Sequence, residues 1–207
     1  MTQALSASDE TALTEAAAAL KRGGLVAFPT DTVYGIGAKY DDRRAVRRLY
    51  AVKARPPEKA IPILVGAISD MDGLTASFPA AAQALTEAFW PGALTLVLPR
   101  SAKVPAVVAP GVTVAVRMPA HQWLLALLQT GGPLAVSSAN RSGQAPALSA
   151  EAARAALGNR IDLIIDTSLA SGAKPSTIAD CSVHPPAVLR EGPVTVAQLR
   201  AALRETG

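Results

Sequence analysis

Four short polar segments carry most of the side chains that could do chemistry. Residues 29–37 (PTDTVYGIG) hold two hydroxyls and a carboxylate followed by two glycines, and residues 53–56 (KARP) hold two cations. Residues 137–143 (SSANRSG) gather hydroxyl and amide groups, and residues 176–178 (STI) add two more hydroxyls. Each segment alone is weak evidence, because Ser, Thr, Asn and Gly are ordinary turn formers. Together they predict a polar, cationic cavity that binds an anion.

Several common kinds of site are excluded by the same residues. The sequence has no G-x-x-x-x-G-K-[ST] phosphate-binding loop, and Gly35-Ile36-Gly37 lacks the third glycine of a dinucleotide-binding turn. His121 and His184 have no partner at the spacing of zinc ligands. Cys181 is the only cysteine, so it forms no intramolecular disulfide, and we expect it to be a small core residue.

The polar segments lie between expected helices and strands. The apolar run 25–28 predicts a buried strand, and we expect the next two glycines, Gly35 and Gly37, to lie in a loop that lets the backbone approach a ligand. Further strands are expected at residues 61–65, 94–98, 112–116, 134–136, 161–165, 177–179 and 188–189. Such strand ends are where α/β proteins bind ligands.

Helices are expected between these strands. Ser8 is expected to cap a helix that ends near Lys21, Asp41 or Asp42 to begin one that ends before Pro56, and Ser149 to cap one that reaches Leu157. Other helices are expected over residues 80–89 and 123–128, and Thr195 with Gln198 forms a capping box for a last helix. The alternation predicts one α/β domain with a twisted mixed sheet.

Length and charge narrow the class of protein. The chain has 207 residues, a net charge of +4 and 50% hydrophobic residues, which fits one soluble domain. No apolar run could span a bilayer and no signal peptide is visible, so we expect a cytoplasmic protein without membrane contact. Residues 39–59 hold eight cations and three anions, so the basic excess lies in this stretch. It could concentrate a nucleotide, phosphate or RNA, or it could be a solvated helix face.

Six short motifs in order resemble one family. They are PTDTVYGIG at 29–37, KARP at 53–56, VRMP at 116–119, SANRSG at 138–143, STIAD at 176–180 and LREG at 189–192. This set is similar to the YrdC-like threonylcarbamoyl-AMP synthase family over about residues 12–205. The resemblance implies the YrdC-like α/β fold, a twisted mixed sheet flanked by helices around a positively charged concave cavity. It also implies one YrdC-like domain over residues 1–207, without the additional C-terminal domain of longer relatives.

The implied activity joins L-threonine, bicarbonate or CO2, and ATP into threonylcarbamoyl-AMP and releases pyrophosphate. That adenylate is the donor for threonylcarbamoyladenosine in tRNA, so downstream tRNA-modification proteins that accept it are implied partners. Mg²⁺ would accompany ATP, and no metal bound by the protein itself is expected. Direct contact with tRNA or double-stranded RNA is left open.

The resemblance also assigns residues. The catalytic set would be Lys53, Arg55, Ser138 and Asn140. L-Threonine would be held by Thr30, Arg117, Ser138 and Ser176, with Arg117 facing its carboxylate or forming a structural ion pair instead. ATP would be held by Lys53, Lys59, Thr113, Asn140 and Arg190, and Thr32 is a weaker candidate. Replacing Lys53 or Arg55 by Ala is expected to abolish turnover and leave thermal stability nearly unchanged.

This sequence departs from the family pattern at three positions. Glu191 follows Arg190 where proline is common, which places a negative charge near the expected nucleotide site. Leu148 stands where a hydroxyl residue is usual, and Ala54 replaces a common glycine, an exchange expected to be harmless. Two other functions stay open: a YrdC-like module that binds double-stranded RNA or tRNA without synthase activity, and a related carbamoyl-adenylate transferase acting on another small substrate.

Overall fold

A computed structural model describes residues 2–166 and 174–204 of the chain, as ten strands and nine helical segments. The strands are β1 (Gln3–Ser6), β2 (Val26–Phe28), β3 (Gly35–Lys39), β4 (Ile63–Leu64), β5 (Leu94–Pro99), β6 (Thr113–Arg117), β7 (Leu134–Ser138), β8 (Leu163–Asp166), β9 (Thr177–Asp180) and β10 (Ala187–Arg190). The α-helices are α1 (Ala12–Lys21), α2 (Arg43–Lys53), α3 (Met71–Leu74), α4 (Ala80–Phe89), α5 (Gln122–Gly131), α6 (Ala150–Leu157) and α7 (Val196–Arg204). Two short 3₁₀ helices are η1 (Ile68–Asp70) and η2 (Gly158–Arg160).

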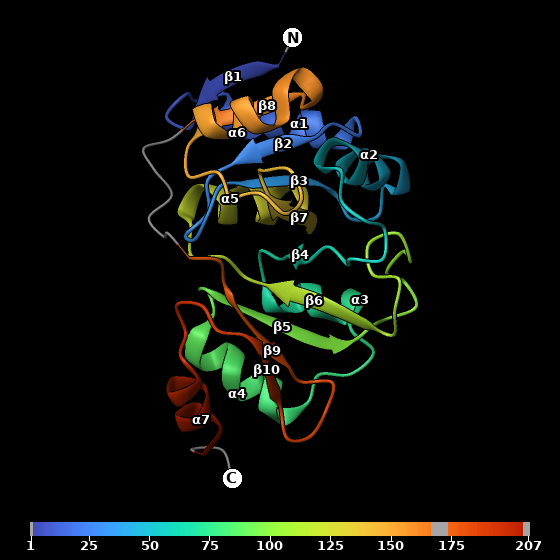
Figure 1. The fold of residues 1–207 in the computed structure, drawn as a ribbon, viewed down its shortest axis with the longest axis vertical. Helices are drawn as coiled ribbons and strands as arrows, with labels where there is room; N and C mark the ends of the chain where they lie inside the picture. Colours follow the sequence, from blue (N-terminus) through green and yellow to red (C-terminus); the bar gives the residue numbers. More distant parts are fainter. Residues whose placement is uncertain (1, 167–173, 205–207) are drawn as a thin grey trace.

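All ten strands join in one twisted sheet, in the order β1-β8-β2-β3-β7-β4-β6-β5-β9-β10 (Figure 1). The sheet is mixed: β1 and β2 run parallel to β8, β4 to β6 and β5 to β9, and the other pairs are antiparallel. The predicted mixed, twisted α/β sheet is therefore confirmed. The short strand β4 joins the part of the sheet built mainly from the first half of the chain to β6, β5, β9 and β10.

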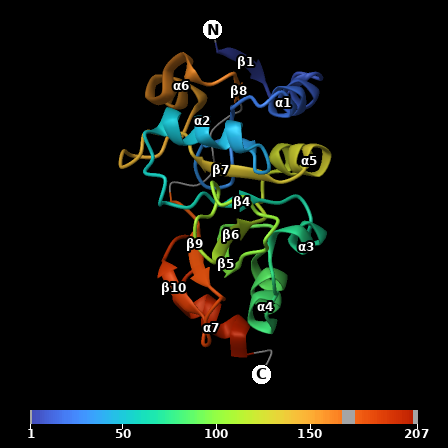
Figure 2. The same cartoon turned by 90° about the vertical axis from the view of Figure 1, so that its right-hand side faces the viewer.

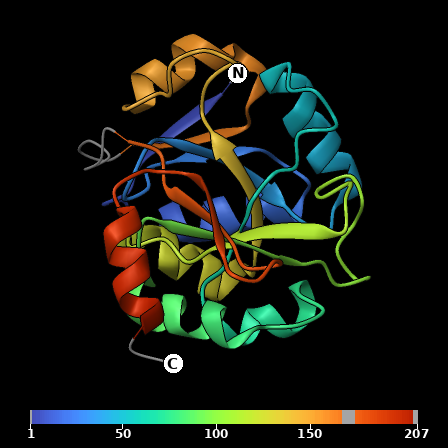
Figure 3. The same cartoon turned by 60° about the horizontal axis from the view of Figure 1, so that its bottom comes forward.

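Helices cover both faces of the sheet because strand side chains alternate between the two faces. In β2, Val26 and Phe28 join a hydrophobic cluster with α1 and α5, and Ala27 joins the opposite cluster with α2 and α6. Figure 2 shows α1 and α5 on one side of the strands and α2 and α6 on the other. At the other end of the sheet α7 packs against α4 (Figure 3).

Local capping signals fix several helix ends as expected. The Asp42 carboxylate accepts hydrogen bonds from the backbone N–H groups of Arg44 and Ala45, and Ser149 Oγ accepts one from Ala152. Before α7, Thr195 and Gln198 bond each other's side chains and backbone, which confirms the predicted capping box.

Two expectations near the N-terminus are wrong. Ser8 does not cap the first helix, which begins at Ala12 after Thr11. Ser8 lies in a turn after β1, a strand that the sequence analysis did not predict. Three of the four residues of β1 are exposed and the fourth is only partly buried, so the strand lacks the apolar pattern by which a strand is recognised. Parallel pairing with β8 holds it in the sheet.

Gly35 and Gly37 also differ from expectation, because they lie in strand β3 and not in a ligand loop. A Cβ atom at Gly37 would lie 2.9 Å from Cζ of Phe28, and one at Gly35 would lie 3.2 Å from Cε2 of the same ring. The glycines therefore make room for an aromatic ring on the neighbouring strand. Among the described residues no helix is both long and apolar enough to cross a membrane.

Candidate functional site

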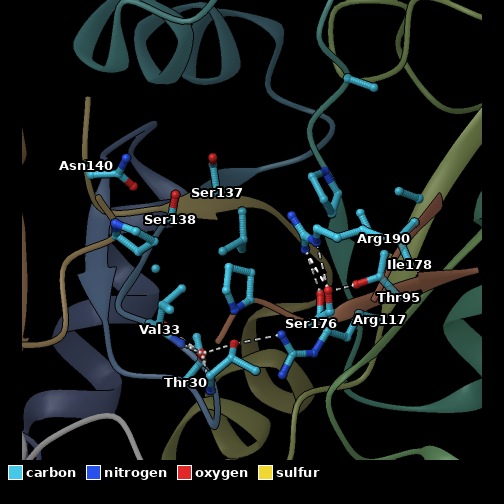
Figure 4. A pocket seen from close by; sticks show the side chains of 18 of the residues that line it. Thr30, Val33, Thr95, Arg117, Ser137, Ser138, Asn140, Ser176, Ile178 and Arg190 are labelled. Carbon is cyan, nitrogen blue, oxygen red and sulfur yellow. Dashed lines mark hydrogen bonds between the residues drawn. The ribbon is translucent and has the colours of Figure 1, made fainter. Parts of the chain in front are cut away.

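A cavity of about 480 Å³ lies at the middle of the sheet, where side chains from β5, β6 and β7 meet the loop after β2 and the end of α2. Figure 4 shows Ser137, Ser138 and Asn140 on one side of this cavity and Thr95, Ser176 and Arg190 on the opposite side. Eight of the ten predicted site residues line it: Thr30, Lys53, Arg55, Arg117, Ser138, Asn140, Ser176 and Arg190. The fold thus gathers the polar segments as the sequence predicted.

Lys59 and Thr113 are the two predicted site residues that do not line the cavity. Lys59 is exposed, and its carbonyl oxygen accepts hydrogen bonds from Arg55 Nε and the Tyr50 hydroxyl. Thr113 begins β6 and lies opposite Pro99 of β5 at the end of the ladder. Neither side chain is placed to touch a ligand inside the cavity, so both ATP assignments lack support from the geometry.

Lys53 is the last residue of α2 and is only 1% exposed. Its ammonium donates hydrogen bonds to the carbonyl oxygens of Ser138 and Asn140. Burial, and next the charge of Arg55, lower the pKa of Lys53 to about 8. Lys53 therefore holds the loop after β7 in place as well as lining the cavity. Because Lys53→Ala would leave two carbonyls without their donor, the structure leads us to expect a loss of stability from this variant, in place of the nearly unchanged stability expected from the sequence.

Arg55 follows Ala54, whose φ of 48° is left-handed. A left-handed residue after a helix favours glycine, so Ala54 is not the harmless exchange that the sequence analysis expected. The turn brings Arg55 Nε to 3.0 Å from the carbonyl oxygen of Lys59 and Nη2 to 2.7 Å from that of Ala60. Arg55 also lines the cavity.

Asn140 is oriented by its own loop. Its amide nitrogen donates to the carbonyl oxygens of Arg141 at 2.8 Å and Gln144 at 2.7 Å. Two carbonyl acceptors require the nitrogen on that side, so they fix which way the amide is turned. The opposite atom, Oδ1, is buried and has no hydrogen-bond partner among the described residues. Asn140 therefore lines the cavity with its amide oxygen left as an unpaired acceptor.

Arg117 ends β6 and is held on three sides. Its Nη2 lies 2.6 Å from Oδ1 of Asp31, Nη1 donates to Thr32 Oγ1 at 2.9 Å, and Nε donates to the Gly92 carbonyl at 2.8 Å. Burial lowers the pKa of the Arg117 guanidinium, and the Asp31 carboxylate opposes that shift. The structural ion pair considered for this residue is thus present, and Arg117 also lines the cavity.

Thr30 shapes the loop after β2. Its hydroxyl accepts from the backbone N–H groups of Thr32 and Val33 and donates to the Val33 carbonyl at 2.7 Å. Because a hydroxyl has one hydrogen, the Thr32 hydroxyl, 3.0 Å away, must be the donor in their contact. Thr30 therefore acts on a ligand through the position of its loop.

Arg190 and Ser176 meet at the opposite wall. Nε and Nη2 of Arg190 donate to the Ser176 carbonyl at 3.0 and 2.8 Å. Burial, and next the nearby Arg117, lower the pKa of Arg190. The two guanidinium groups therefore repel each other at one end of the cavity, where an anion between them would relieve the repulsion.

Glu191 and Leu148, two of the three departures from the family pattern, lie outside the cavity lining. Glu191 turns to the start of α7, where its carboxylate accepts a 3.3 Å hydrogen bond from the Val196 N–H. Leu148 is exposed just before α6. Neither side chain brings a negative charge or a gap to the cavity wall.

Sequence reasoning missed several lining residues. Thr95 is 2% exposed in β5, and Gln144 belongs to the loop after β7. Thr95 belongs to no motif, and in the sequence it is indistinguishable from an ordinary polar residue in an apolar strand. Only its parallel pairing beside β9 brings it to Ser176.

The lining is rich in cations. It includes Lys53, Arg55, Arg117 and Arg190, and none of the described residues that line it is Asp or Glu. Over residues 2–166 and 174–204 no group of three or more His, Cys, Asp or Glu could hold a metal ion. These walls can neutralise a ligand with several negative charges, and they offer serine, threonine and amide groups for its uncharged parts.

Comparisons with known proteins identify the family of this chain. A Mycobacterium leprae relative is 42% identical over 200 residues, covering 92% of this chain and 87% of its own length. The Bacillus subtilis threonylcarbamoyl-AMP synthase is 39% identical over 206 residues, covering 98% of this chain. The crystal structure of Pyrococcus abyssi Sua5 in complex with L-threonine matches 98% of this chain with a TM-score of 0.93 and 36% identity.

The chain spans only part of two of these relatives: 59% of the B. subtilis protein and 60% of the P. abyssi chain. The model of the family Sua5_yciO_yrdC, described as telomere recombination, matches residues 18–192. The family model, the relatives and the fold all indicate the same family, and this chain belongs to the Sua5/YciO/YrdC family.

Proposed function

We propose that this protein synthesises threonylcarbamoyl-AMP from L-threonine, bicarbonate or CO2, and ATP, with release of pyrophosphate. One observation carries the proposal: the cationic and hydroxyl residues of four separate segments line one cavity, in a chain whose relatives include a threonylcarbamoyl-AMP synthase and a threonine-bound structure. The product would serve as the donor for threonylcarbamoyladenosine in tRNA. Because the reaction would use ATP and serve tRNA, we expect it to take place in the cytoplasm.

The reaction needs two bond-forming steps. The neutral amine of threonine forms a C–N bond with CO2 and loses a proton, which gives a carbamate. A carbamate oxygen then attacks the α-phosphorus of ATP, the bond from that phosphorus to the β-phosphate oxygen breaks, and pyrophosphate leaves. The carbamate and the triphosphate are both anionic, so the protein must hold them together against their repulsion.

The residues on the cavity walls suggest which side chain would bind which part of the substrates. Arg117 and Ser176 would hold the threonine carboxylate, with Thr30 fixing the loop beneath it. Arg55 would neutralise the phosphates, because a guanidinium can grip a pair of oxygens. Lys53 adds a positive charge and holds the carbonyls of Ser138 and Asn140.

Asn140 and Arg190 complete the ATP side. The free amide oxygen of Asn140 suits a ligand N–H or O–H group, such as those of the carbamate or the ribose. Arg190 would meet the nucleotide at the opposite wall. Mg²⁺ would arrive bound to ATP, since the lining has no carboxylate to hold a resident ion.

The alternative functions fit less well. An RNA-binding module needs cations along a surface, whereas here hydroxyl and amide groups line one cavity together with the cations. A carbamoyl-adenylate transferase for another substrate would leave the threonine-bound relative unexplained. The partners that accept the adenylate would be tRNA-modification proteins.

The test is the amino-acid dependence of pyrophosphate release. Purified protein with ATP, Mg²⁺, bicarbonate and threonine is expected to release pyrophosphate, and omission of threonine is expected to stop it. Equal release with serine or without an amino acid would remove the threonine assignment. Binding of RNA without any pyrophosphate release would favour the binding module instead.

A further inference from the structure

Thr95 lies on the cavity wall and belongs to none of the sequence motifs. It is buried in β5, and its Oγ1 lies 2.8 Å from Oγ of Ser176. Parallel pairing places Leu94 opposite Thr177, which brings Thr95 level with the residues that begin β9. Figure 4 draws the contact between Thr95 and Ser176 on the side of the cavity that holds Arg190.

Arg190 limits the hydrogen bonds that the Ser176 hydroxyl can form. Besides its two hydrogen bonds to the Ser176 carbonyl, Nη2 of Arg190 lies 3.4 Å from Ser176 Oγ. A guanidinium only donates hydrogen bonds, so the Ser176 oxygen is the acceptor in that contact. The hydrogen of Ser176 is left to point toward Thr95 or into the cavity.

The hydroxyl hydrogens of the pair can be counted. Thr95 and Ser176 carry one each, and one of the two is used in the bond that joins them. Among the described residues no other acceptor for these hydroxyls lies within hydrogen-bonding distance. Whichever residue donates to the other, one hydrogen remains, and both residues line the cavity.

A ligand atom that takes this hydrogen must be an acceptor. Arg117 and Arg190 lie at the same end of the cavity, where each lowers the cost of an anionic oxygen. Hydrogen bonds to a charged oxygen are about twice as strong as those between neutral groups. The pair therefore suits an anionic oxygen, which in the proposed reaction is a carboxylate of the amino acid or a phosphate of ATP.

We propose that Thr95 is a positioning residue for the amino-acid substrate: it locks the Ser176 hydroxyl so that the pair gives one hydrogen bond to the threonine carboxylate. This inference rests on the proposed function. It assigns the hydrogen bond to the carboxylate of threonine because Arg117, whose guanidinium reaches the same end of the cavity, suits a carboxylate. Thr95→Val removes the hydroxyl and keeps the shape of the side chain. Ser176 would then lose the partner that fixes its rotamer.

The first measurement is threonine binding by calorimetry, followed by steady-state pyrophosphate release. For Thr95→Val we expect the Kd and KM for threonine to rise about tenfold, with the KM for ATP, kcat and the melting temperature nearly unchanged. Thr95→Ser keeps a hydroxyl and should restore most of the affinity. Thr86→Val is the matched control, because this buried threonine donates to the Gln83 carbonyl on α4, outside the cavity lining.

A double-mutant cycle shows whether Thr95 acts through Ser176. In a Ser176→Ala background, Thr95→Val should change the threonine Kd by less than about twofold. The inference is overturned if Thr95→Val leaves the threonine Kd unchanged, if its effect is the same in both backgrounds, or if the KM for ATP moves instead. A wild-type protein that binds threonine and releases no pyrophosphate would overturn the proposed function alone, and one that does not bind threonine would overturn both.

Discussion

Lys53 is a buried cation whose hydrogen bonds join α2 to the loop after β7. In the folded protein its pKa falls from 10.5 to about 8, because burial disfavours the charged form. The unfolded chain therefore binds more protons than the folded one between these values. The contribution of Lys53 to the free energy of unfolding must rise with pH across that window and stay constant below it.

The direction of this pH dependence of the unfolding free energy can be measured. Relative to Lys53→Met, the wild-type protein should gain roughly 3 kcal/mol in free energy of unfolding between about pH 7 and about pH 11. Urea unfolding of both proteins at the two pH values gives the difference, and Lys21→Met, at an exposed lysine, is the control. A difference between wild type and Lys53→Met that does not change with pH would contradict the buried-ammonium assignment.

Strand β3 forms part of the sheet beside the cavity only because its glycines leave room for Phe28. Gly37→Ala places a Cβ 2.9 Å from Cζ of the Phe28 ring, which is buried in the cluster with α1 and α5. We expect the variant to lose about 1–3 kcal/mol of unfolding free energy through overpacking. Gly73→Ala in α3 meets nothing within 4 Å and should be neutral or stabilising, and urea unfolding compares the two. Equal stability of both variants would show that the ring moves aside freely.

Across the whole molecule, the basic stretch 39–59 divides between two environments. Arg43, Arg44 and Arg47 are exposed on α2, whereas Lys53 and Arg55 line the cavity. Arg48 is held by Asp162 at 2.9 Å and by the Gly23 carbonyl. The exposed arginines thus form a solvated helix face, and the cations that line the cavity come from the end of α2 and the turn after it.

This division predicts that the KM for ATP responds differently when charge is removed from the exposed face of α2 and from the cavity. Changing Arg43, Arg44 and Arg47 together to Gln should leave the KM for ATP within about twofold, because exposed charges are screened by solvent. Arg55→Gln should raise that KM about tenfold, because it removes a phosphate-facing charge from the cavity. Steady-state pyrophosphate release at fixed ionic strength checks both. A larger loss in the triple variant would place the anion site on the outer face of α2.

Local signals in the sequence predicted most of the elements. The capping residues Asp42, Ser149 and Thr195 act over three positions, so their effects can be recognised without the rest of the chain. Polar β1 and glycine-rich β3 were missed because neighbouring strands hold them in the sheet, against their own weak tendency to form strands.

The sequence by itself determined the fold class, the polar segments and, through their ordered resemblance, most of the cavity residues. Only the tertiary structure decided which groups touch: Lys53 with the Asn140 carbonyl, Arg117 with Asp31, and Thr95 with Ser176, each separated by more than eighty positions along the chain. The physical reason is that hydrogen bonds act over about 3 Å, so their partners depend on sheet order and register, and no local pattern encodes these.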